Sequence, residues 1–314
     1  MTEKSPPRFI TKWKYIPEFL LVIVTILWGT TFIITKKTTE IVPPFLYLSL
    51  RFGISFFAMV PLLFHSKSFF SSKKKWKISL IAGLLYFFSI ATQTIGLQYT
   101  SASKASFITA LGVIFVPLFM SILYKKKIHW LLWIAVVLAI VGVGLLSFSG
   151  LERLSWGDPL VLACAIFYAF YVIYLEKHLH EVEIIPFTAI QVFIIGILSF
   201  ILSLIIDFGV SSEPIPFHQV FTAPNILVYL YMGIIATNGT FILQSYGQKF
   251  VSSSRASLIF AFEPFFATIF AILGGELLTI AIGCGMALVF TAVILSILSP
   301  QDPLLLGNKE NNAQ

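Results

Sequence analysis

Residues 96–110 read GLQYTSASKASFITA, and residues 247–261 read GQKFVSSSRASLIFA. The two stretches match at Gly, Ser, Ala and Ile positions throughout, and they begin about half a chain length apart. In each copy a Ser-rich polar turn with one cation, Lys104 or Arg255, precedes a long apolar run. This repetition indicates a protein built from two homologous halves.

The composition excludes a soluble globule. Of the 314 residues 58% are hydrophobic and 11% are charged, and the mean hydropathy is +0.93. A soluble domain has about 25% charged residues. The net charge of +7 fits an excess of cations on short cytoplasmic loops better than nucleic-acid binding. We therefore expect a lipid bilayer as the surroundings and no nucleic-acid partner.

Ten apolar segments follow a basic leader, and each is long enough for a helix to cross about 30 Å of hydrocarbon. None alternates as a barrel strand would. The predicted fold is therefore an all-α integral membrane protein with ten transmembrane helices. The segments lie at about 19–36, 44–64, 78–98, 102–124, 130–149, 159–176, 185–206, 225–246, 252–273 and 277–298.

The predicted organisation is a leader at 1–18, a first five-helix repeat at 19–149, a linker at 150–158, a second repeat at 159–298 and a tail at 299–314. Lys and Arg gather on alternate loops, which places both termini in the cytoplasm of a multi-pass cell (inner) membrane protein. The Ser-rich copies open segments four and nine. An odd number of spans separates them, so the repeats are inverted, as in many secondary transporters. A duplication kept only for packing is the alternative.

Polar residues within the spans are the candidate substrate-binding residues, because polar groups in lipid are costly and face a bundle interior or a pathway. Each could instead serve helix packing. Arg51 either contacts an anionic substrate group or is a structural cation. Glu263, beside Pro264, holds a proton, pairs with a cation or caps a helix break. The full set is Trp28, Arg51, Gln93, Tyr168, Tyr171, Gln191, Asn238, Gln244 and Glu263.

Lys104 and Arg255 fall at the ends of spans. We expect them to extend to lipid headgroups, with lining of the two cavity mouths as the alternative. The sequence has no catalytic constellation, no cofactor motif and no metal-binding spacing among its Cys and His residues. An enzyme is therefore not predicted.

Several motifs in order resemble the EamA family of the drug/metabolite transporter superfamily, in its ten-helix form. The resemblance implies two inverted five-helix repeats around a cavity lined by segments one to four and six to nine. The motifs are LWGTTF (27–32), LRFGISF (50–56), TQTIGLQYTSASKASFITALGVIFVPLF (92–119), WGDPLVLACAIFYAFYVIYL (156–175) and RASLIFAFEPFFATIFAILGGELL (255–278).

The resulting hypothesis is a secondary transporter that exports or exchanges small organic metabolites such as amino acids by alternating access. No nucleotide-binding motif is present, so a proton or substrate gradient would supply the energy, with Glu263 as the candidate for proton coupling. A membrane sensor or assembly protein and a lipid-modifying membrane enzyme are the alternatives.

Overall fold

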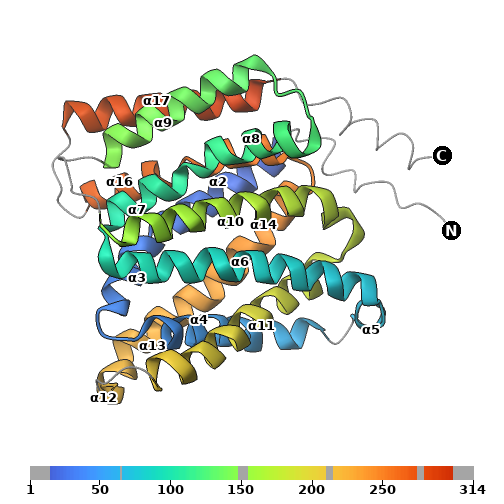
Figure 1. Cartoon of the computed structure of the whole chain (residues 1–314), viewed down its shortest axis with the longest axis vertical. Coiled ribbons are helices and arrows are strands. Elements are labelled where there is room, and N and C mark those ends of the chain that lie inside the picture. Colours follow the sequence, from blue (N-terminus) through green and yellow to red (C-terminus); the bar gives the residue numbers. More distant parts are fainter. Residues whose placement is uncertain (1–14, 64–65, 148–154, 210–214, 274–278, 300–314) are drawn as a thin grey trace.

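The computed structural model describes residues 15–63, 66–147, 155–209, 215–273 and 279–299. Within these ranges the regular structure is entirely helical, as predicted (Figure 1). Most of the predicted leader and tail, and part of the linker, lie outside the described residues.

The described part of the first half forms seven principal helices, with a short 3-10 turn (η1, Val60–Leu63) and a short helix (α5, Lys67–Phe70) between them. The first helix begins earlier than the predicted segment, so Glu18 lies in its first turn. The principal helices are α2 (Ile16–Gly29), α3 (Thr31–Thr39), α4 (Pro44–Met59), α6 (Lys73–Tyr99), α7 (Ala102–Ala110), α8 (Gly112–Tyr124) and α9 (Trp130–Ser147).

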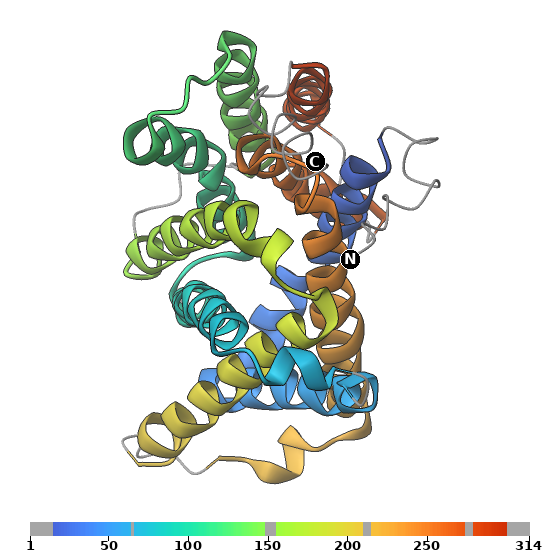
Figure 2. The ribbon, with the colours of Figure 1, turned by 90° about the vertical axis from the view of Figure 1, so that its right-hand side faces the viewer.

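The second half repeats this order with more interruptions. Its elements are α10 (Gly157–His178), η2 (Leu179–Glu181), α11 (Ile184–Leu202), η3 (Ser203–Asp207), α12 (Phe217–Val220), α13 (Ala223–Leu230), η4 (Tyr231–Gly239), α14 (Thr240–Gln248), α15 (Ser253–Phe260), α16 (Glu263–Leu273) and α17 (Ile280–Leu298). Figure 2 looks at the molecule from the side where α2 begins.

Eight helical runs in the described ranges are long and apolar enough to cross a membrane. Two of the ten predicted spans fall short of this length. The apolar part of α9 covers Trp130–Leu145, and the ninth segment is divided into α15 and α16. The eight runs are Ile16–Thr39, Pro44–Leu63, Lys73–Tyr99, Lys104–Tyr124, Gly157–Glu181, Ile184–Asp207, Ala223–Gln248 and Ile280–Leu298.

Helices of one half pack against helices of the other. The pairs α9–α17 and α4–α11 each join two helices with the same place in their halves. The pairs α6–α10 and α2–α14 are equivalent under the repeat. In the second half, α10 takes the place of α2, and the run that ends in α14 takes the place of α6. The two halves are therefore interleaved, and each completes the core of the other.

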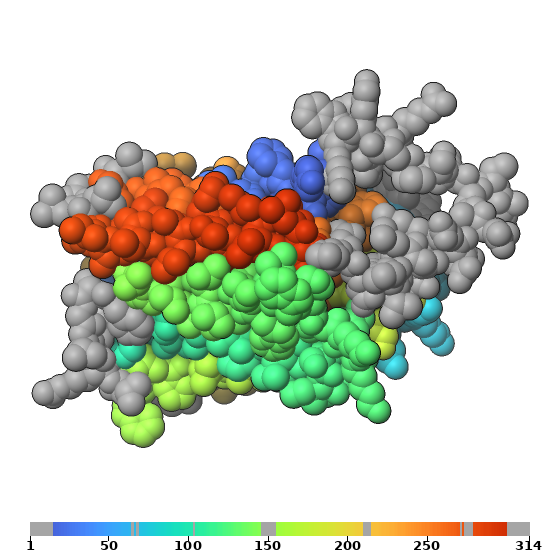
Figure 3. All heavy atoms as spheres, turned by 90° about the horizontal axis from the view of Figure 1, so that it is seen from above, coloured from blue at the N-terminus to red at the C-terminus, as the bar shows by residue number. Residues whose placement is uncertain are grey.

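The outer surface over α9 and α17 is apolar, as lipid requires. Figure 3 shows these two helices side by side on one face of the molecule. Their outward side chains include Trp130, Val137, Phe290 and Leu298, each more than half exposed. Large exposed apolar surfaces are rare on soluble monomers, so this face is built to contact hydrocarbon.

The repeated glycine marks the closest approach between the halves. A Cβ on Gly96 would lie 2.7 Å from Val161 Cγ2 and 3.0 Å from the Gly157 carbonyl oxygen. A Cβ on Gly247 would lie 2.6 Å from Leu21 Cδ2 and 2.8 Å from a backbone oxygen of α2. Any larger residue would separate these helices, which explains why both copies of the repeat carry Gly.

The Ser-rich turns cap the helices that follow them. Ser101 Oγ accepts a hydrogen bond from the backbone nitrogen of Lys104 at 3.2 Å, and Ser252 Oγ accepts one from Arg255 at 3.4 Å. A serine at this position satisfies a backbone N–H that the helix start leaves unpaired. The repeat thus encodes the same helix start twice.

The two Ser-rich turns lie at opposite ends of α10. Thr100 Oγ1, in the first turn, donates to Asp158 at 2.9 Å, at the start of α10. Ser253, in the second, donates its backbone N–H to Glu176 at 2.7 Å, near the end of α10. With a rise of about 1.5 Å per residue, these two carboxylates are roughly 27 Å apart along the helix. This arrangement is the one that an inverted repeat requires.

Candidate functional site

Three helical runs break near the middle of the molecule. The run α2–α3 is interrupted at Thr30, α7–α8 at Leu111, and α15–α16 at Ala261 and Phe262. The last two breaks occupy the same position in the repeat. Broken helices place unpaired backbone groups and polar side chains at membrane depth, where transporters bind substrates and ions.

A pocket lies between these breaks and contains about 710 Å³ of empty space, including the part open to solvent. Its walls come from α2, α3, α4, α6, α7, α8, α10, α15 and the start of α16, and thus from both halves. The lining residues are Trp28, Thr31, Arg51, Tyr86, Ser89, Ile90, Gln93, Thr109, Ala110, Gly112, Val113, Val116, Cys164, Tyr168, Ser257, Phe260, Ala261 and Glu263.

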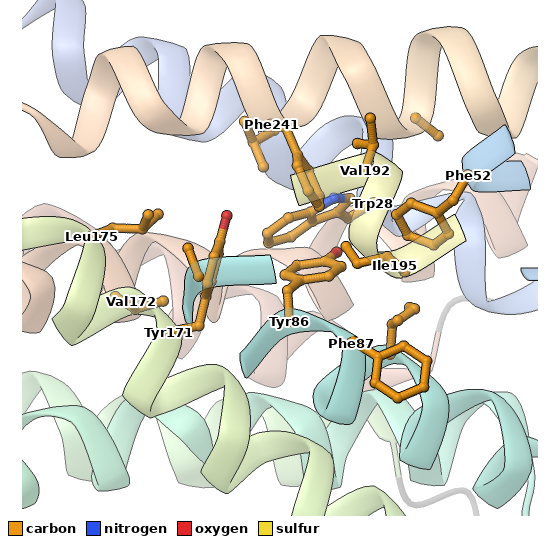
Figure 4. Close-up of a cluster of buried hydrophobic side chains, with 14 of the residues drawn as sticks. Trp28, Phe52, Tyr86, Phe87, Tyr171, Val172, Leu175, Val192, Ile195 and Phe241 are labelled. Atoms are coloured by element: carbon orange, nitrogen blue, oxygen red, sulfur yellow. The ribbon is translucent and has the colours of Figure 1, made fainter. Parts of the chain in front are cut away.

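Aromatic rings form one wall of the pocket. The ring of Trp28 lies 5.8 Å from that of Tyr168, edge to face, and 5.4 Å from that of Phe260. The ring centre of Tyr86 lies 4.5 Å from that of Phe241 within a buried cluster (Figure 4). It lies 6.2 Å from that of Tyr168, which packs against this cluster. Such ring pairs stabilise one another, and they give the pocket an apolar wall.

Arg51 is buried and tied to the opposite half. Its Nε donates to Thr237 Oγ1 at 2.9 Å, and its guanidinium carbon lies 5.4 Å from the ring centre of Phe52. Thr237 belongs to the π-helical η4 and also donates to the carbonyl of Met232. Arg51 forms no ion pair with any acid in the described ranges. Its charge is therefore available to the pocket that it lines.

Glu263 is the first residue of α16, and Pro264 follows it. Its side chain is 9% exposed and lines the pocket. Over the described part of the chain, its carboxylate has no hydrogen-bond or ion-pair partner. A buried carboxylate is costly unless it is paired or protonated. One predicted role of Glu263 was to pair with a protein cation. No described residue forms such a pair with it.

Gln93 and Tyr168 complete the predicted residues that line the pocket. Gln93 Nε2 donates to Thr109 Oγ1 at 3.3 Å, which links α6 to α7. Tyr168 Oη accepts a hydrogen bond from Gln244 Nε2 at 3.0 Å. Both side chains are partly satisfied by the protein and still present polar atoms to the pocket.

The four other predicted residues do not line the pocket, and three of them, Tyr171, Asn238 and Gln244, contact a neighbouring helix. Tyr171 is fully buried, with its ring 5.1 Å from that of Tyr86. Asn238 accepts from the hydroxyl of Ser55 and donates to its carbonyl at 2.9 Å. Gln191 donates to a backbone carbonyl of its own helix at 3.5 Å, and Gln244 donates to Tyr168 and, at 2.8 Å, to Gln248.

Several pocket residues were not among the predicted ones. Tyr86, Ser89, Thr109, Ser257 and Phe260 all face the cavity. Ser257 belongs to the repeated stretch, which was a signal for its importance. Thr109 and Phe260 also lie in that stretch, at equivalent positions that differ between the copies. Ser89 lies outside it and carries no such signal, because hydroxyls within apolar helices commonly bond to their own backbone.

The expectation that Lys104 and Arg255 extend to lipid headgroups is wrong. Neither extends to the headgroup region, since both are about 95% buried. Lys104 pairs with Asp158, and Arg255 pairs with Glu18. The sequence does not reveal these partners, because each lies in the other half of the chain.

A search of the described residues finds no group of three metal-ligating side chains. Cys164 is buried and Cys284 is exposed, and both are free thiols.

The EamA-like transporter family model matches the chain twice, over residues 16–148 and 155–298. The chain belongs to the EamA-like transporter family. An uncharacterized transporter from Archaeoglobus fulgidus is 31% identical over 283 residues, covering 88% of this chain and 83% of the relative. The uncharacterized transporter YoaV of Bacillus subtilis is 24% identical over 288 residues, covering 88% and 94%.

The fold of this EamA protein also has a counterpart among solved structures. A crystal structure with 18% sequence identity superposes with a TM-score of 0.74 and covers 90% of this chain and 98% of the other. Identity this low speaks for the fold alone. Family membership, related transporters and the apolar helices together identify a multi-pass membrane transporter of small molecules.

Proposed function

We propose that this EamA protein is a secondary transporter that exports or exchanges small organic metabolites, amino acids among them. The solute binds in the central pocket and reaches either side of the cell (inner) membrane by alternating access between two inverted five-helix repeats, with both termini cytoplasmic. The proposal rests chiefly on one observation, that broken helices of both halves meet at a pocket carrying an unpaired carboxylate.

The chemistry of the pocket suits a zwitterion with an apolar body. Arg51 presents a guanidinium that can hold a carboxylate. Glu263 presents a carboxylate that can hold an ammonium group. The rings of Trp28, Tyr168 and Phe260 supply a wall for an apolar side chain.

Proton coupling follows from the isolation of Glu263. When the pocket is empty, burial favours the protonated carboxyl, because a charge without a partner is poorly solvated there. When a cationic group binds beside it, the ionised form is favoured and the proton leaves. Exchange of proton for solute on one side chain couples the two fluxes.

The test is counterflow and uptake by the purified protein in proteoliposomes, using a panel of labelled amino acids and other small metabolites with and without a pH gradient. We expect uptake of at least one zwitterion, accelerated by the gradient. Glu263→Gln is expected to abolish the response to the gradient, and Arg51→Ala to raise the KM for a carboxylate-bearing solute by about tenfold or more, which corresponds to about 1.4 kcal/mol.

The matched control is Glu183→Gln, which removes the same charge at an exposed ion pair with Lys75. This variant is expected to retain the gradient response. If Glu263→Gln keeps a wild-type response to the gradient, Glu263 does not couple protons. If no solute in a broad panel moves, the transport proposal is wrong for these chemical classes.

A further inference from the structure

Two buried ion pairs join the halves of the molecule. Lys104 Nζ lies 2.6 Å from Asp158 Oδ2, and Arg255 Nη1 lies 3.1 Å from Glu18 Oε1. All four side chains are less than one-tenth exposed. In each pair, the cation belongs to one half and the carboxylate to the other.

The two pairs are counterparts in the repeat. Lys104 and Arg255 occupy the same position in the Ser-rich stretch, three residues after the capping serine. Glu18 and Asp158 both lie in the first turn of the first helix of their halves, α2 and α10. The residue before each carboxylate is packed against the repeated glycine, Gly247 or Gly96. The whole junction, not only the charges, is therefore duplicated.

The two junctions lie at opposite ends of the helix bundle. Asp158 is at the start of α10 beside the first Ser-rich turn, and the second turn lies at the other end of α10, beside Glu176. Figure 1 places α7, which carries Lys104, toward the end of the bundle where α10 begins. Between the two junctions lies the central pocket, which the broken runs α7–α8 and α15–α16 both line.

We propose that the pairs Lys104–Asp158 and Arg255–Glu18 are the two closures of the transport pathway and separate alternately. This inference rests on the proposed function. If α7 moves away from α10 at one end, or α15 from α2 at the other, the pair at that end must separate, because each pair joins those two helices. Separated charges need water, so opening and hydration of an end occur together, while the intact pair excludes water from the other end.

The two ends are not equally held. Three more ion pairs between the halves lie at the end where Arg255 pairs with Glu18. Lys74–Glu181 and Lys75–Glu183 are largely exposed and contribute little, whereas the carboxylate of Lys126–Glu176 is buried. At the Asp158 end, Lys104–Asp158 is the one ion pair between halves that the described residues form. Counted over the described residues, the Asp158 end thus has fewer ion pairs between the halves. The three additional pairs are Lys74–Glu181, Lys75–Glu183 and Lys126–Glu176.

The test measures from which side of the membrane the pocket can be reached. In a Cys164→Ala/Cys284→Ala background, Ser257→Cys places a reporter thiol in the pocket lining. The full-length protein is reconstituted in sealed vesicles of known orientation, and a membrane-impermeant maleimide is added to either side. Asp158→Asn is expected to accelerate labelling at least about tenfold from one side only, since it removes the anion that faces the buried Lys104 ammonium in the closed state.

Glu18→Gln is expected to accelerate labelling from the opposite side, and by a smaller factor because Lys126–Glu176 also joins the halves at that end. The control Glu183→Gln is expected to leave the labelling from both sides unchanged. Acceleration from the same side in both variants, or equally from both sides, would overturn the proposal. A purely structural role would lower the thermal stability without making the labelling depend on the side.

A second variant decides the matter if Asp158→Asn fails to fold. Lys104→Gln in the same background removes the cation of the pair and leaves the Asp158 carboxylate with hydrogen bonds from Thr100 and Ser155. It is expected to accelerate labelling from the Asp158 side at least about tenfold. Unchanged labelling from this side would refute the closure at this end.

Solute uptake in the same vesicles separates this inference from the proposed function. If labelling follows the pairs while no solute moves, the closures exist and the transport proposal fails. If solute moves while the side of labelling is unaffected by either carboxylate, transport stands and the closures are refuted.

Discussion

Gly157→Ala is expected to destabilise the protein, because the added methyl group has no room between α10 and α6. A Cβ at this position would lie 2.3 Å from the Gly96 carbonyl oxygen, whereas ordinary contact begins at 3.4 Å. The two helices must therefore part by about 1 Å at this point, and the obstacle is backbone that cannot rotate away. Overpacking of this kind typically costs about 1–3 kcal/mol.

The better helix propensity of alanine offsets only part of this cost, since Gly157 is the first residue of α10 and the full gain of about 1 kcal/mol applies to helix interiors. We expect a net loss of roughly 1–2 kcal/mol. The measurement is thermal unfolding of the purified protein in detergent micelles, followed by tryptophan fluorescence. A decrease in Tm of roughly 2–6 °C corresponds to this loss.

Gly53→Ala is the matched control. Gly53 lies inside α4, and a Cβ there would meet no atom within 4 Å. This variant is expected to have an unchanged or slightly higher Tm, because alanine stabilises the helix and clashes with nothing. A Gly157→Ala protein as stable as the Gly53→Ala protein would refute the claim that the repeated glycine marks an obligatory close approach.

Four other substitutions test the framework around the pocket. Phe241→Ala removes a fully buried ring 4.5 Å from that of Tyr86, and we expect a loss of about 3–5 kcal/mol in the same unfolding assay. Ser101→Ala and Ser252→Ala each remove a helix cap, and each is expected to cost about 1 kcal/mol. A much larger effect in only one of them would contradict their equivalence. Glu176→Gln breaks an ion pair and weakens the acceptor at the start of α15; it is expected to lower Tm more than Glu183→Gln, whose pair is exposed.

The sequence was sufficient for the features that depend on local composition. Apolar length and the scarcity of charge predict helices in lipid, because each segment must satisfy its backbone within itself. The repeat predicts two related halves, and the model of the EamA-like family matches both. Arg51 and Glu263 stand out in the sequence because a charge inside an apolar segment is costly, and the structure places both in the pocket lining.

The direction in which each side chain points was beyond the sequence. Gln93 and Gln244 look alike as amides within apolar helices, yet Gln93 faces the pocket and Gln244 bonds to Tyr168 and Gln248. The difference is the rotation of each helix about its axis, which packing against several neighbours determines. The break that leaves Glu263 at a helix start is likewise a property of the assembled bundle.

The partners of the repeated cations were also decided by tertiary structure alone. By sequence, Lys104 and Arg255 are long cations at span ends, for which headgroups are the ordinary destination. The interleaving of the halves brings Asp158 and Glu18 beside them and buries the pairs. Hydropathy and repeats are carried by neighbouring residues and can be read along the chain, whereas these contacts join residues of opposite halves and exist only once both halves have packed together.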